Sequence, residues 1–222
     1  MKHESFNESI EMYLKSVSEL ATGDDLVAIS ALAAHLGVST VSATEMVHRL
    51  RERELLDHVP YKGVALTEAG HQRACFVIRR HRLWERFLAD HLGLPWATVH
   101  DQACRLEHAT DTAVTEALAA FLGHPATCPH GNPIPSADGQ LPPINDIPIS
   151  DMTPGQSGAI TRIHPESELL LDYLYGRDIR PGQPITFNEM APFNGPLMTT
   201  IDGASHALGH EVAAHIYVEI SP

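Results

Sequence analysis

The sequence predicts a mainly α-helical protein with small β elements: an N-terminal winged helix-turn-helix, a helical middle domain and a C-terminal β-barrel. Three patterns predict it: an amphipathic helix over residues 6–21, two helices separated by a short turn, and short β-like runs after residue 158. Of the 222 residues, 43% are hydrophobic and 19% are charged, and no apolar run is long enough to span a membrane. This composition is typical of a soluble globular protein and excludes a disordered or fibrous chain.

The helix-turn-helix pattern follows the first helix. A short helix is predicted over Ile29–Leu36, and Gly37 ends it as a C-terminal glycine does. Ser39 is placed to cap a second helix over Val41–Leu56. Two short apolar runs around Tyr61–Gly63 then predict a β-hairpin. A basic second helix followed by a hairpin is typical of a winged DNA-binding domain.

The remaining chain divides into helices, a linker and short strands. The helix that begins at Thr67 is followed by breaks at Gly93 and Pro95, a helix from about Trp96 to Leu106, and another that ends near Leu122. Proline-rich residues 125–156 predict a linker or an extended wrap without regular structure.

A small β-barrel of about 65 residues is predicted beyond the linker. Its strands are AITRI, PITFNEM, PLMTTID and VAAHIYVEI, and its short helix covers Glu166–Leu174. The segment HALGHEVAAH is assigned to β structure, where its histidines do not share a face.

Charge is distributed unevenly along the chain. The formal net charge is −13, yet Arg49–Arg86 hold nine of the fifteen basic residues against five acidic ones. Leu106–Pro222 hold three basic residues and fourteen acidic ones. DNA affinity depends on the local patch that meets the phosphates, so the first half can bind DNA while the second half faces away from it. Mixed charge is also what a solvated helix face shows, and that interpretation stays open.

Cysteine usage is sparse. Three cysteines are too few and too odd in number for a disulfide framework, and the N-terminus does not resemble a signal peptide, so a cytoplasmic location is expected. Cys75 and Cys128 are assigned structural roles.

Metal-ligand spacing concentrates in the middle third. His81 and Glu85 are separated by four residues on one predicted helix, so they share a face. The next helix carries an imidazole, a thiol, a carboxylate and a second imidazole on one stripe, in the order His100, Cys104, Glu107 and His108. A lone His–Glu pair is usually an ion pair, but four such groups on one stripe favour a divalent transition metal. The remaining histidines considered lack a partner at metal spacing and are assigned to the surface or loops: His91, His124, His130, His206, His210 and His215.

These segments resemble those of the diphtheria-toxin-repressor (DtxR) family of iron- or manganese-dependent transcriptional repressors. The resemblance covers EMYLKSVSEL, RRHRLWERFL, VHDQACRLEH and HGNPIP, and the HDxACxxEH run is its most specific part. It implies a winged helix-turn-helix over residues 1–72, a helical metal-binding and dimerisation domain over 73–140, a linker over 141–156 and an SH3-like (FeoA-like) domain over 157–222. It also implies a homodimer that binds double-stranded operator DNA when loaded with Fe(II) or Mn(II), and that is not an enzyme.

The resemblance also assigns ligands by position. It implies a primary site of Met12, Cys104, Glu107 and His108, and an ancillary site that contains His81, Glu85 and His100. The third domain adds an ancillary ligand in the family, and in HPESELLLDYL the candidates are Glu166 and Glu168. Soft thioether and thiolate ligands favour Fe(II) over Mn(II).

The predicted recognition helix opens with short polar side chains that can reach base edges or phosphates. The candidate DNA contacts are Ser39, Thr40, Ser42, Thr44, Glu45, Arg49, Arg51 and Lys62. Ser39 is also expected to cap the helix. Two other classes stay open from the residues: a metal-independent winged-helix regulator that senses an organic ligand, and a metalloenzyme, which lacks an HExxH or comparable motif here.

Overall fold

The computed structural model describes residues 2–21 and 25–221. The chain forms two compact units. The first contains Met1–Arg80 with Pro135–Leu141, and the second contains His81–Ile134 with Pro142–Pro222. The first unit is built around one apolar core, whereas the second contains the core of the C-terminal sheet and two smaller clusters among its helices.

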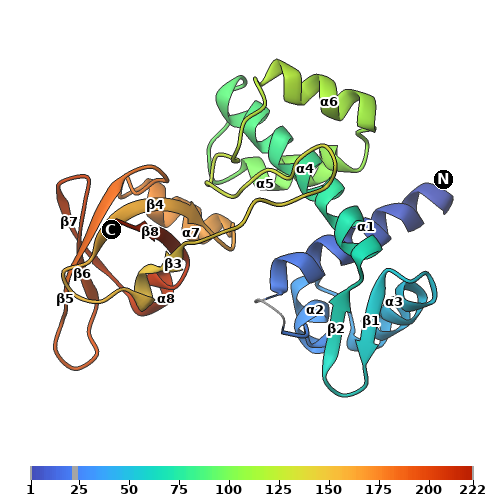
Figure 1. Ribbon diagram of the computed structural model, residues 1–222, viewed down its shortest axis with the longest axis horizontal. Helices are drawn as coiled ribbons and strands as arrows, with labels where there is room; N and C mark the ends of the chain where they lie inside the picture. The colour runs from blue at the N-terminus through green and yellow to red at the C-terminus, as the bar shows by residue number, and fades with distance from the viewer. Residues whose placement is uncertain (1, 22–24, 222) are drawn as a thin grey trace. The chain divides into compact units, whose positions relative to one another are not determined.

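Three helices form the core of the first unit: α1 (Lys2–Leu20), α2 (Ile29–His35) and α3 (Thr40–Glu52) (Figure 1). The predicted α1 stripe is confirmed, because Leu14 and its apolar neighbours are buried against α2 and α3. Gly37 has a φ of 65°, the left-handed conformation that lets glycine end α2. The Ser39 side chain accepts a hydrogen bond from the backbone N–H of Ser42, which confirms the predicted N-cap of α3.

Helix α3 is shorter than predicted. It ends at Glu52 rather than at Leu56, because Glu54 adopts a left-handed φ of 58° and the chain turns. Leu56 then begins strand β1 (Leu56–Val59), where its side chain is buried in the core of the unit. Leu55 and Leu56 therefore belong to the turn and to the strand. Their apolar side chains also fit the helical period of α3, so the sequence pattern did not show where the helix ends.

The predicted wing is confirmed. Strand β1 pairs antiparallel with β2 (Gly63–Leu66), and the hairpin lies beside α3 (Figure 1). Val27 adds an isolated bridge to Val64, so the wing is tied to the helices by a third short segment. Gly63 has no room for a side chain, since a Cβ there would lie 2.5 Å from the Val27 carbonyl oxygen. The loop between the strands carries the fully exposed Tyr61 and Lys62.

Helix α4 (Glu68–Asp90) runs from the first unit into the second, which also contains α5 (Val99–Glu107) and α6 (Thr112–Phe121). Helix α5 starts three residues later than predicted, because Pro95 closes a turn in which its carbonyl accepts the Thr98 N–H at 2.9 Å. Asp111 caps α6 by accepting the Val114 N–H. None of the helices in the described part of the chain is both long enough and apolar enough to cross a lipid bilayer.

A six-stranded sheet with the order β3-β8-β4-β5-β6-β7 forms the C-terminal domain (Figure 1). Phe187 and Ile160 lie in its core with the apolar face of α7. Its elements are β3 (Ile147–Pro148), the short 3-10 helix η1 (Ile149–Asp151), β4 (Ser157–Ile163), α7 (Glu168–Tyr175), β5 (Pro184–Met190), β6 (Leu197–Ile201), β7 (Ala204–Leu208), α8 (His210–Ala213) and β8 (Ile216–Ile220).

Three expectations for this domain are corrected. The segment 125–156 is not wholly irregular, because β3 pairs with β8 and Ile149 of η1 is fully buried. An edge position accommodates Pro148, which has no N–H to donate. The run VAAHIYVEI is a strand only from Ile216, since its start belongs to α8. The segment HALGHEVAAH is β structure only at its start, because its first residues belong to the exposed edge strand β7 and His210–Ala213 form α8.

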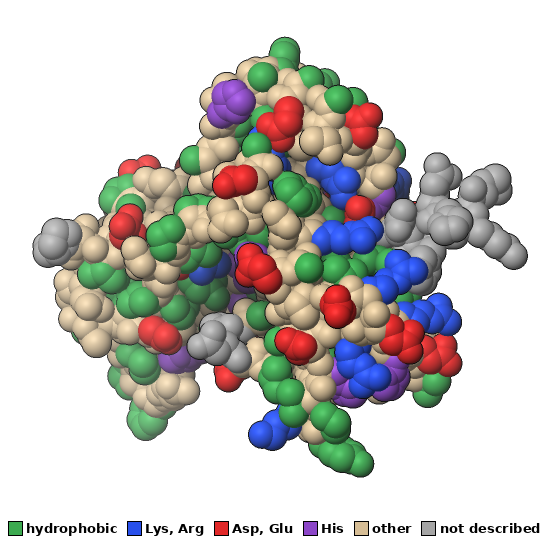
Figure 2. All heavy atoms as spheres, turned by 45° about the vertical axis from the view of Figure 1, so that its right-hand side comes forward, with side chains coloured by type: hydrophobic (Ala, Val, Ile, Leu, Met, Phe, Trp, Pro, Cys, Tyr) green, Lys and Arg blue, Asp and Glu red, His purple; other side chains and the backbone are tan. Residues whose placement is uncertain are grey.

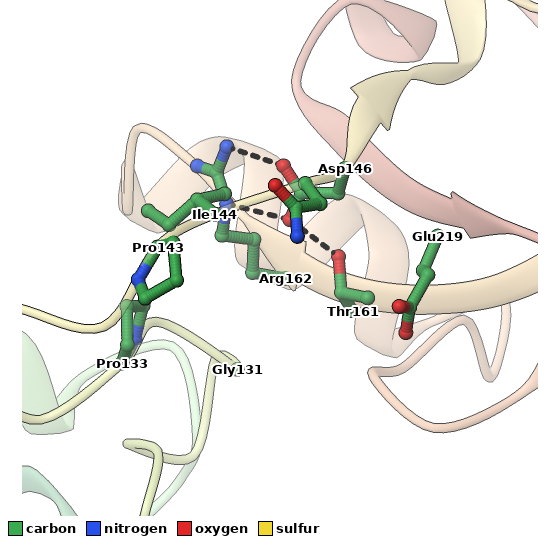
Figure 3. Close-up of a pocket in the computed structure, with 9 residues that line it drawn as sticks. Gly131, Pro133, Pro143, Ile144, Asp146, Thr161, Arg162 and Glu219 are labelled. Atoms are coloured by element: carbon green, nitrogen blue, oxygen red, sulfur yellow. Dashed lines mark hydrogen bonds and ion pairs between the residues drawn. The ribbon is translucent and has the colours of Figure 1, made fainter.

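The linker is fastened to β4 beside a pocket of about 190 Å³ (Figure 3). Arg162 donates two hydrogen bonds to Asp146, at 2.8 and 2.9 Å, and its guanidinium lies over the Tyr217 ring. Thr161 donates a third hydrogen bond to the same carboxylate at 2.7 Å. The charge of Arg162 is therefore already balanced, and a bidentate pair of this kind holds the linker in a defined place.

Candidate metal centre

Helix α4 presents two of the predicted ligands to the interior of the second unit. His81 and Glu85 lie one turn apart, and both side chains are almost completely buried. His81 Nε2 and Glu85 Oε1 are 3.0 Å apart. Burying a carboxylate costs free energy unless a charge or hydrogen bond compensates it, so this pair requires further partners.

Helix α5 and the start of the C-terminal domain supply those partners. His100 Nδ1 lies 3.3 Å from Glu85 Oε1 and 3.1 Å from Glu166 Oε2. The ligand atoms of His81, Glu85, His100 and Glu166 all lie within 4.8 Å of one another. The structure therefore brings the three ancillary residues expected from the sequence together with one of the two third-domain candidates.

Glu166 and Glu168 are separated by the start of α7. Glu166 lies before the helix and points toward His100, whereas Glu168 is exposed in the first turn of α7. None of the donor groups found among the described residues contains Glu168. The acidic side chain near a helix N-terminus is favourable there without any metal.

Cys104 also lies in this region. Its Sγ is 3.7 Å from His100 Nε2 and 3.9 Å from His81 Nδ1, so these three residues form a donor group of their own. Glu107 Oε2 is 2.6 Å from His81 Nδ1, and Glu107 Oε1 is 3.2 Å from His108 Nε2. Cys104 and Glu107 thus lie beside His81, and His108 lies beside Glu107. Met12 belongs to the other compact unit, and its role as a fourth ligand stays a prediction.

Two residues assigned to other roles belong to the centre. Cys128 and His130 were interpreted as a structural cysteine and a surface or loop histidine, yet both are buried and form a donor group with Glu85 and Glu166. They were missed because they lie in an irregular loop, where no helical spacing relates them to α4. The one available signal was the Cys-x-His spacing within CPH, which places a thiol and an imidazole two residues apart.

The loop that carries Cys128 and His130 is held in place by α4 and by the segment before α5. The Arg86 guanidinium donates to the carbonyls of Thr127, at 2.9 and 3.1 Å, and of Cys128, at 3.1 Å. Trp96 Nε1 donates to the Pro129 carbonyl at 3.1 Å. These donors satisfy the buried carbonyls of three successive loop residues and tie the loop to α4 and to the segment before α5.

Hydrogen bonding sets the orientation of His130. Its Nε2 lies 2.9 Å from the Trp96 carbonyl, an acceptor, so Nε2 carries the proton and donates it. Nδ1 then faces Glu85 and Glu166, at 3.7 Å from an oxygen of each. A histidine whose second nitrogen donates to a carbonyl is oriented as metal-ligating histidines are.

The protonation of the cluster follows from its charges. Burial would lower the pKa of His100, but hydrogen bonds with Cys104, Glu166 and Glu85 raise it to about 12. Burial alone would raise the pKa of Glu85, yet the neighbouring His81 charge and hydrogen bonds with three histidines hold it well below its usual range. Burial and the charges of Glu85 and Glu166 raise the pKa of the Cys128 thiol to about 12. Without a cation, protons on the histidines balance the two carboxylates.

One carboxylate oxygen of the cluster has no hydrogen-bond partner. Glu85 Oε2 is buried and has no hydrogen-bond partner, which is uncommon for a carboxylate oxygen. Imidazole, carboxylate and thiol groups are the ligands that divalent transition metals use, and a cation beside Glu85 would satisfy this oxygen. The residues present therefore fit a metal ion.

The candidate DNA contacts lie on the exposed side of α3 and on the wing. All are exposed except Thr44, which is half-buried and donates its hydroxyl hydrogen to the Thr40 carbonyl at 2.7 Å. The hydroxyl oxygens of Ser39 and Ser42 lie 2.9 Å apart. On the face shown in Figure 2, basic and acidic side chains are interspersed rather than gathered into one uniform patch.

A winged helix-turn-helix together with a buried His, Glu and Cys cluster defines a metal-binding DNA-binding regulator. Residues 5–64 match the family model described as "Iron dependent repressor, N-terminal DNA binding domain". "Iron dependent repressor, metal binding and dimerisation domain" matches residues 67–136, and "FeoA domain" matches residues 147–220.

Individual relatives agree with these matches. The iron-dependent repressor IdeR of Mycobacterium tuberculosis is 30% identical over 96% of this chain and 97% of its own length. A solved manganese-dependent transcriptional repressor in complex with manganese is 34% identical, covers 96% of this chain and 100% of its own, and superimposes with a TM-score of 0.88. The repressor ScaR with bound Zn²⁺ is 31% identical over 95% of this chain and 98% of its own, with a TM-score of 0.83.

The chain belongs to the family of iron-dependent repressors that includes IdeR and the diphtheria toxin repressor. It is a metal-dependent transcriptional repressor with a C-terminal FeoA domain of SH3-like fold.

Proposed function

We propose that this repressor binds its operator when the cluster around Glu85 holds a divalent transition cation. The observation that carries the proposal is the donor group of the buried His81 and Glu85 with the partly buried His100 and Glu166, in which Glu85 Oε2 has no hydrogen-bond partner. Such a group is costly without a counter-charge, so its retention in the core indicates a ligand.

The cation is Fe(II) or Mn(II) in this proposal. Carboxylate and imidazole ligands accept both ions, and the thiols of Cys104 and Cys128 favour Fe(II) over Mn(II). A bound cation supplies positive charge that holds the surrounding side chains in one arrangement. The relatives include an iron-dependent repressor and a manganese-dependent one, which supports the same pair of ions.

Helix α4 is the element that can relate the cluster to DNA binding. It carries His81 and Glu85 in its second half, while its first half packs in the DNA-binding unit. Near the middle of α4, Arg80 forms an ion pair with Glu11 of α1 at 2.9 Å. The neighbouring Met12 is proposed to join Cys104, Glu107 and His108 as the primary site, so that metal binding fixes α1.

Operator contacts are proposed for the exposed end and face of α3 and for the wing. The short polar side chains of α3 read base edges or phosphates, while Arg49, Arg51 and Lys62 contact phosphates. A dimer places two such helices in successive major grooves, roughly 34 Å apart. Lys62→Ala should weaken binding to all sequences alike and reduce the salt slope by about 1.

Three finer assignments complete the proposal. The protein acts in the cytoplasm, where DNA and reduced cysteines are found together. It acts as a regulator without an enzymatic activity of its own. The domain boundaries are proposed at residues 72 and 140; the linker predicted over 141–156 shortens to 141–146, because β3 already belongs to the sheet of the FeoA domain.

A gel-shift titration tests the proposal and its two alternatives. The probe is a duplex selected from a random library by the full-length protein in the presence of Mn(II). The expected result is binding that EDTA abolishes and added Fe(II), under anaerobic conditions, or Mn(II) restores. Binding that is unchanged by EDTA would support the organic-ligand regulator instead, and a failure to select any duplex would support the metalloenzyme.

A further inference from the structure

Helix α3 has an exposed stripe on the side opposite the residues that it buries in the core. Ala43, Val47 and Leu50 are buried, whereas Val41 in the first turn and Glu45 one turn later are exposed. Their spacing of four residues places Val41 and Glu45 next to each other on the stripe. In a winged helix-turn-helix domain, the N-terminal half of this helix meets the base edges in the major groove.

Glu45 has hydrogen-bonding capacity that its polar neighbours have already used. The Ser39 hydroxyl accepts the Ser42 N–H at 3.1 Å and lies 2.9 Å from the Ser42 hydroxyl, and Thr44 donates to the Thr40 carbonyl at 2.7 Å. Within the described part of the chain, Glu45 forms no hydrogen bond and no ion pair. Its carboxylate is therefore available as an acceptor on the DNA-facing side of α3.

Neither of two usual reasons for an exposed glutamate on a helix applies to Glu45. It lies in the second turn of α3, beyond the first turn in which the helix N-terminus stabilises a negative charge. Arg49 follows four residues later, but no ion pair joins these two described residues. Because the phosphates of DNA repel a carboxylate, a negative charge at this place weakens binding unless a base donates a hydrogen bond to it.

Cytosine is the base whose major-groove edge suits a carboxylate beside an apolar side chain. An ionised carboxylate only accepts hydrogen bonds, and the donors in the major groove are the amino groups at cytosine N4 and adenine N6. Adenine places its N7 acceptor beside N6, which repels a carboxylate, whereas the C5 position beside cytosine N4 carries no acceptor. Val41 is 70% exposed, and its methyl groups lie one turn before Glu45, where they can contact that C5 edge.

We propose that Glu45 accepts a hydrogen bond from N4 of a cytosine in each operator half-site and thereby sets the base that the second turn of α3 reads. This inference rests on the proposed function, since it concerns the same DNA interface. The carboxylate excludes the other bases at this position, because thymine O4, guanine O6 and N7, and adenine N7 would each oppose it with an acceptor. A well-made base contact of this kind changes affinity by about 5–100-fold.

Selection of duplexes from a random library tests the assignment. The full-length parent, Glu45→Ala and Glu45→Gln each select duplexes in the presence of Mn(II), and the bound sequences are compared. The parent should select a cytosine in each half-site at a position that Glu45→Ala no longer specifies, while the other selected positions stay the same. Glu45→Gln should select adenine there, because an amide accepts from N6 and donates to N7. Exposed Glu52→Gln, at the C-terminal end of α3, is the matched control and should select the parent's sequence.

Affinities for the selected duplex, measured by fluorescence anisotropy, complete the test. Exchanging the C·G pair for T·A should weaken the parent by about fivefold or more and leave Glu45→Ala unchanged. A cytosine preference that persists in Glu45→Ala, or an equal gain in its affinity for every duplex, would overturn the inference, because the carboxylate would then only repel phosphates. If binding still requires Mn(II) in that case, the proposed function stands; binding by the parent that EDTA leaves unchanged contradicts the proposed function itself.

Discussion

The two halves of the metal cluster are built in different ways. His81, Glu85 and His100 lie on the regular helices α4 and α5, and their spacing is visible in the sequence. Cys128 and His130 lie in an irregular loop whose backbone is held by side chains from elsewhere, Arg86 and Trp96 among them. The positions of the ligand side chains on helices are therefore set by local helix geometry, whereas those in the loop depend on tertiary hydrogen bonds.

Exchanging one acidic residue of the cluster for its amide should have the largest effect. Glu166→Gln removes a charge that faces both halves, so cation affinity should fall by about 10–100-fold or more, and metal-activated operator binding should fall with it. The measurement is isothermal titration with Mn(II), followed by the gel shift.

The matched control is Glu168→Gln, two residues away and exposed. It should bind Mn(II) as the parent does. If instead Glu168→Gln weakened binding and Glu166→Gln did not, the third-domain ligand would be misassigned.

Two buried cysteines, one in the cluster and one outside it, allow a second comparison of a variant with a matched control. Cys128→Ser removes the thiolate from the loop half, so Co(II) affinity should fall more than Mn(II) affinity because the lost ligand is soft. Cys75→Ser changes an equally buried cysteine of the DNA-binding unit and should alter thermal stability without altering metal preference. Equal losses for the two metals in Cys128→Ser would place Cys128 outside the ligand set.

Loosening the loop without removing a ligand should have a smaller effect. Arg86→Lys keeps the charge but loses the planar guanidinium that contacts the Thr127 and Cys128 carbonyls together. We expect cation affinity of the Cys128 half to fall by roughly tenfold, at the low end of the range for residues that orient ligands.

Arg105→Lys, on the exposed side of α5, is the control for Arg86→Lys. The thiolate-to-Co(II) absorption of each variant reports the Cys128 half directly. An unchanged titration in Arg86→Lys would show that the loop holds its shape without the guanidinium.

The smallest of the expected effects is that of pH on folding stability. Its sign should differ between the metal-free and the metal-loaded protein. His100 has a raised pKa, so its contribution to stability is complete below its unfolded value of 6.5 and is lost as pH rises toward about 12. Glu85 has a lowered pKa, so its contribution is present above 4.5 and is lost as pH falls. The metal-free cluster therefore contributes most between these values.

Metal binding requires neutral imidazoles, so its contribution grows with pH. Thermal unfolding measured between about pH 6 and about pH 8 should show a rising difference between loaded and metal-free protein. A difference that shrinks over this range would mean that the histidines are not the ligands.

Much of the architecture could be predicted from local patterns. The apolar spacing of α1, the cap at Ser39, the left-handed Gly37 and the wing hairpin each follow from a few neighbouring residues, and the structure confirms them. Where the pattern was ambiguous, the prediction was wrong at the boundary: Leu56 belongs to a strand rather than to α3. Strand β3 was hidden by its proline, because only its pairing with β8 stabilises it.

The sequence by itself determined which side chains share a helix face, because the helical period relates residues three and four apart. It therefore placed His81 with Glu85, and His100 with Cys104. Only the tertiary structure decided that Glu166 rather than Glu168 meets His100, and that Cys128 and His130 lie at the same carboxylates. The physical reason is that these contacts join segments tens of residues apart, and their geometry is set by packing and long-range hydrogen bonds that no local period records.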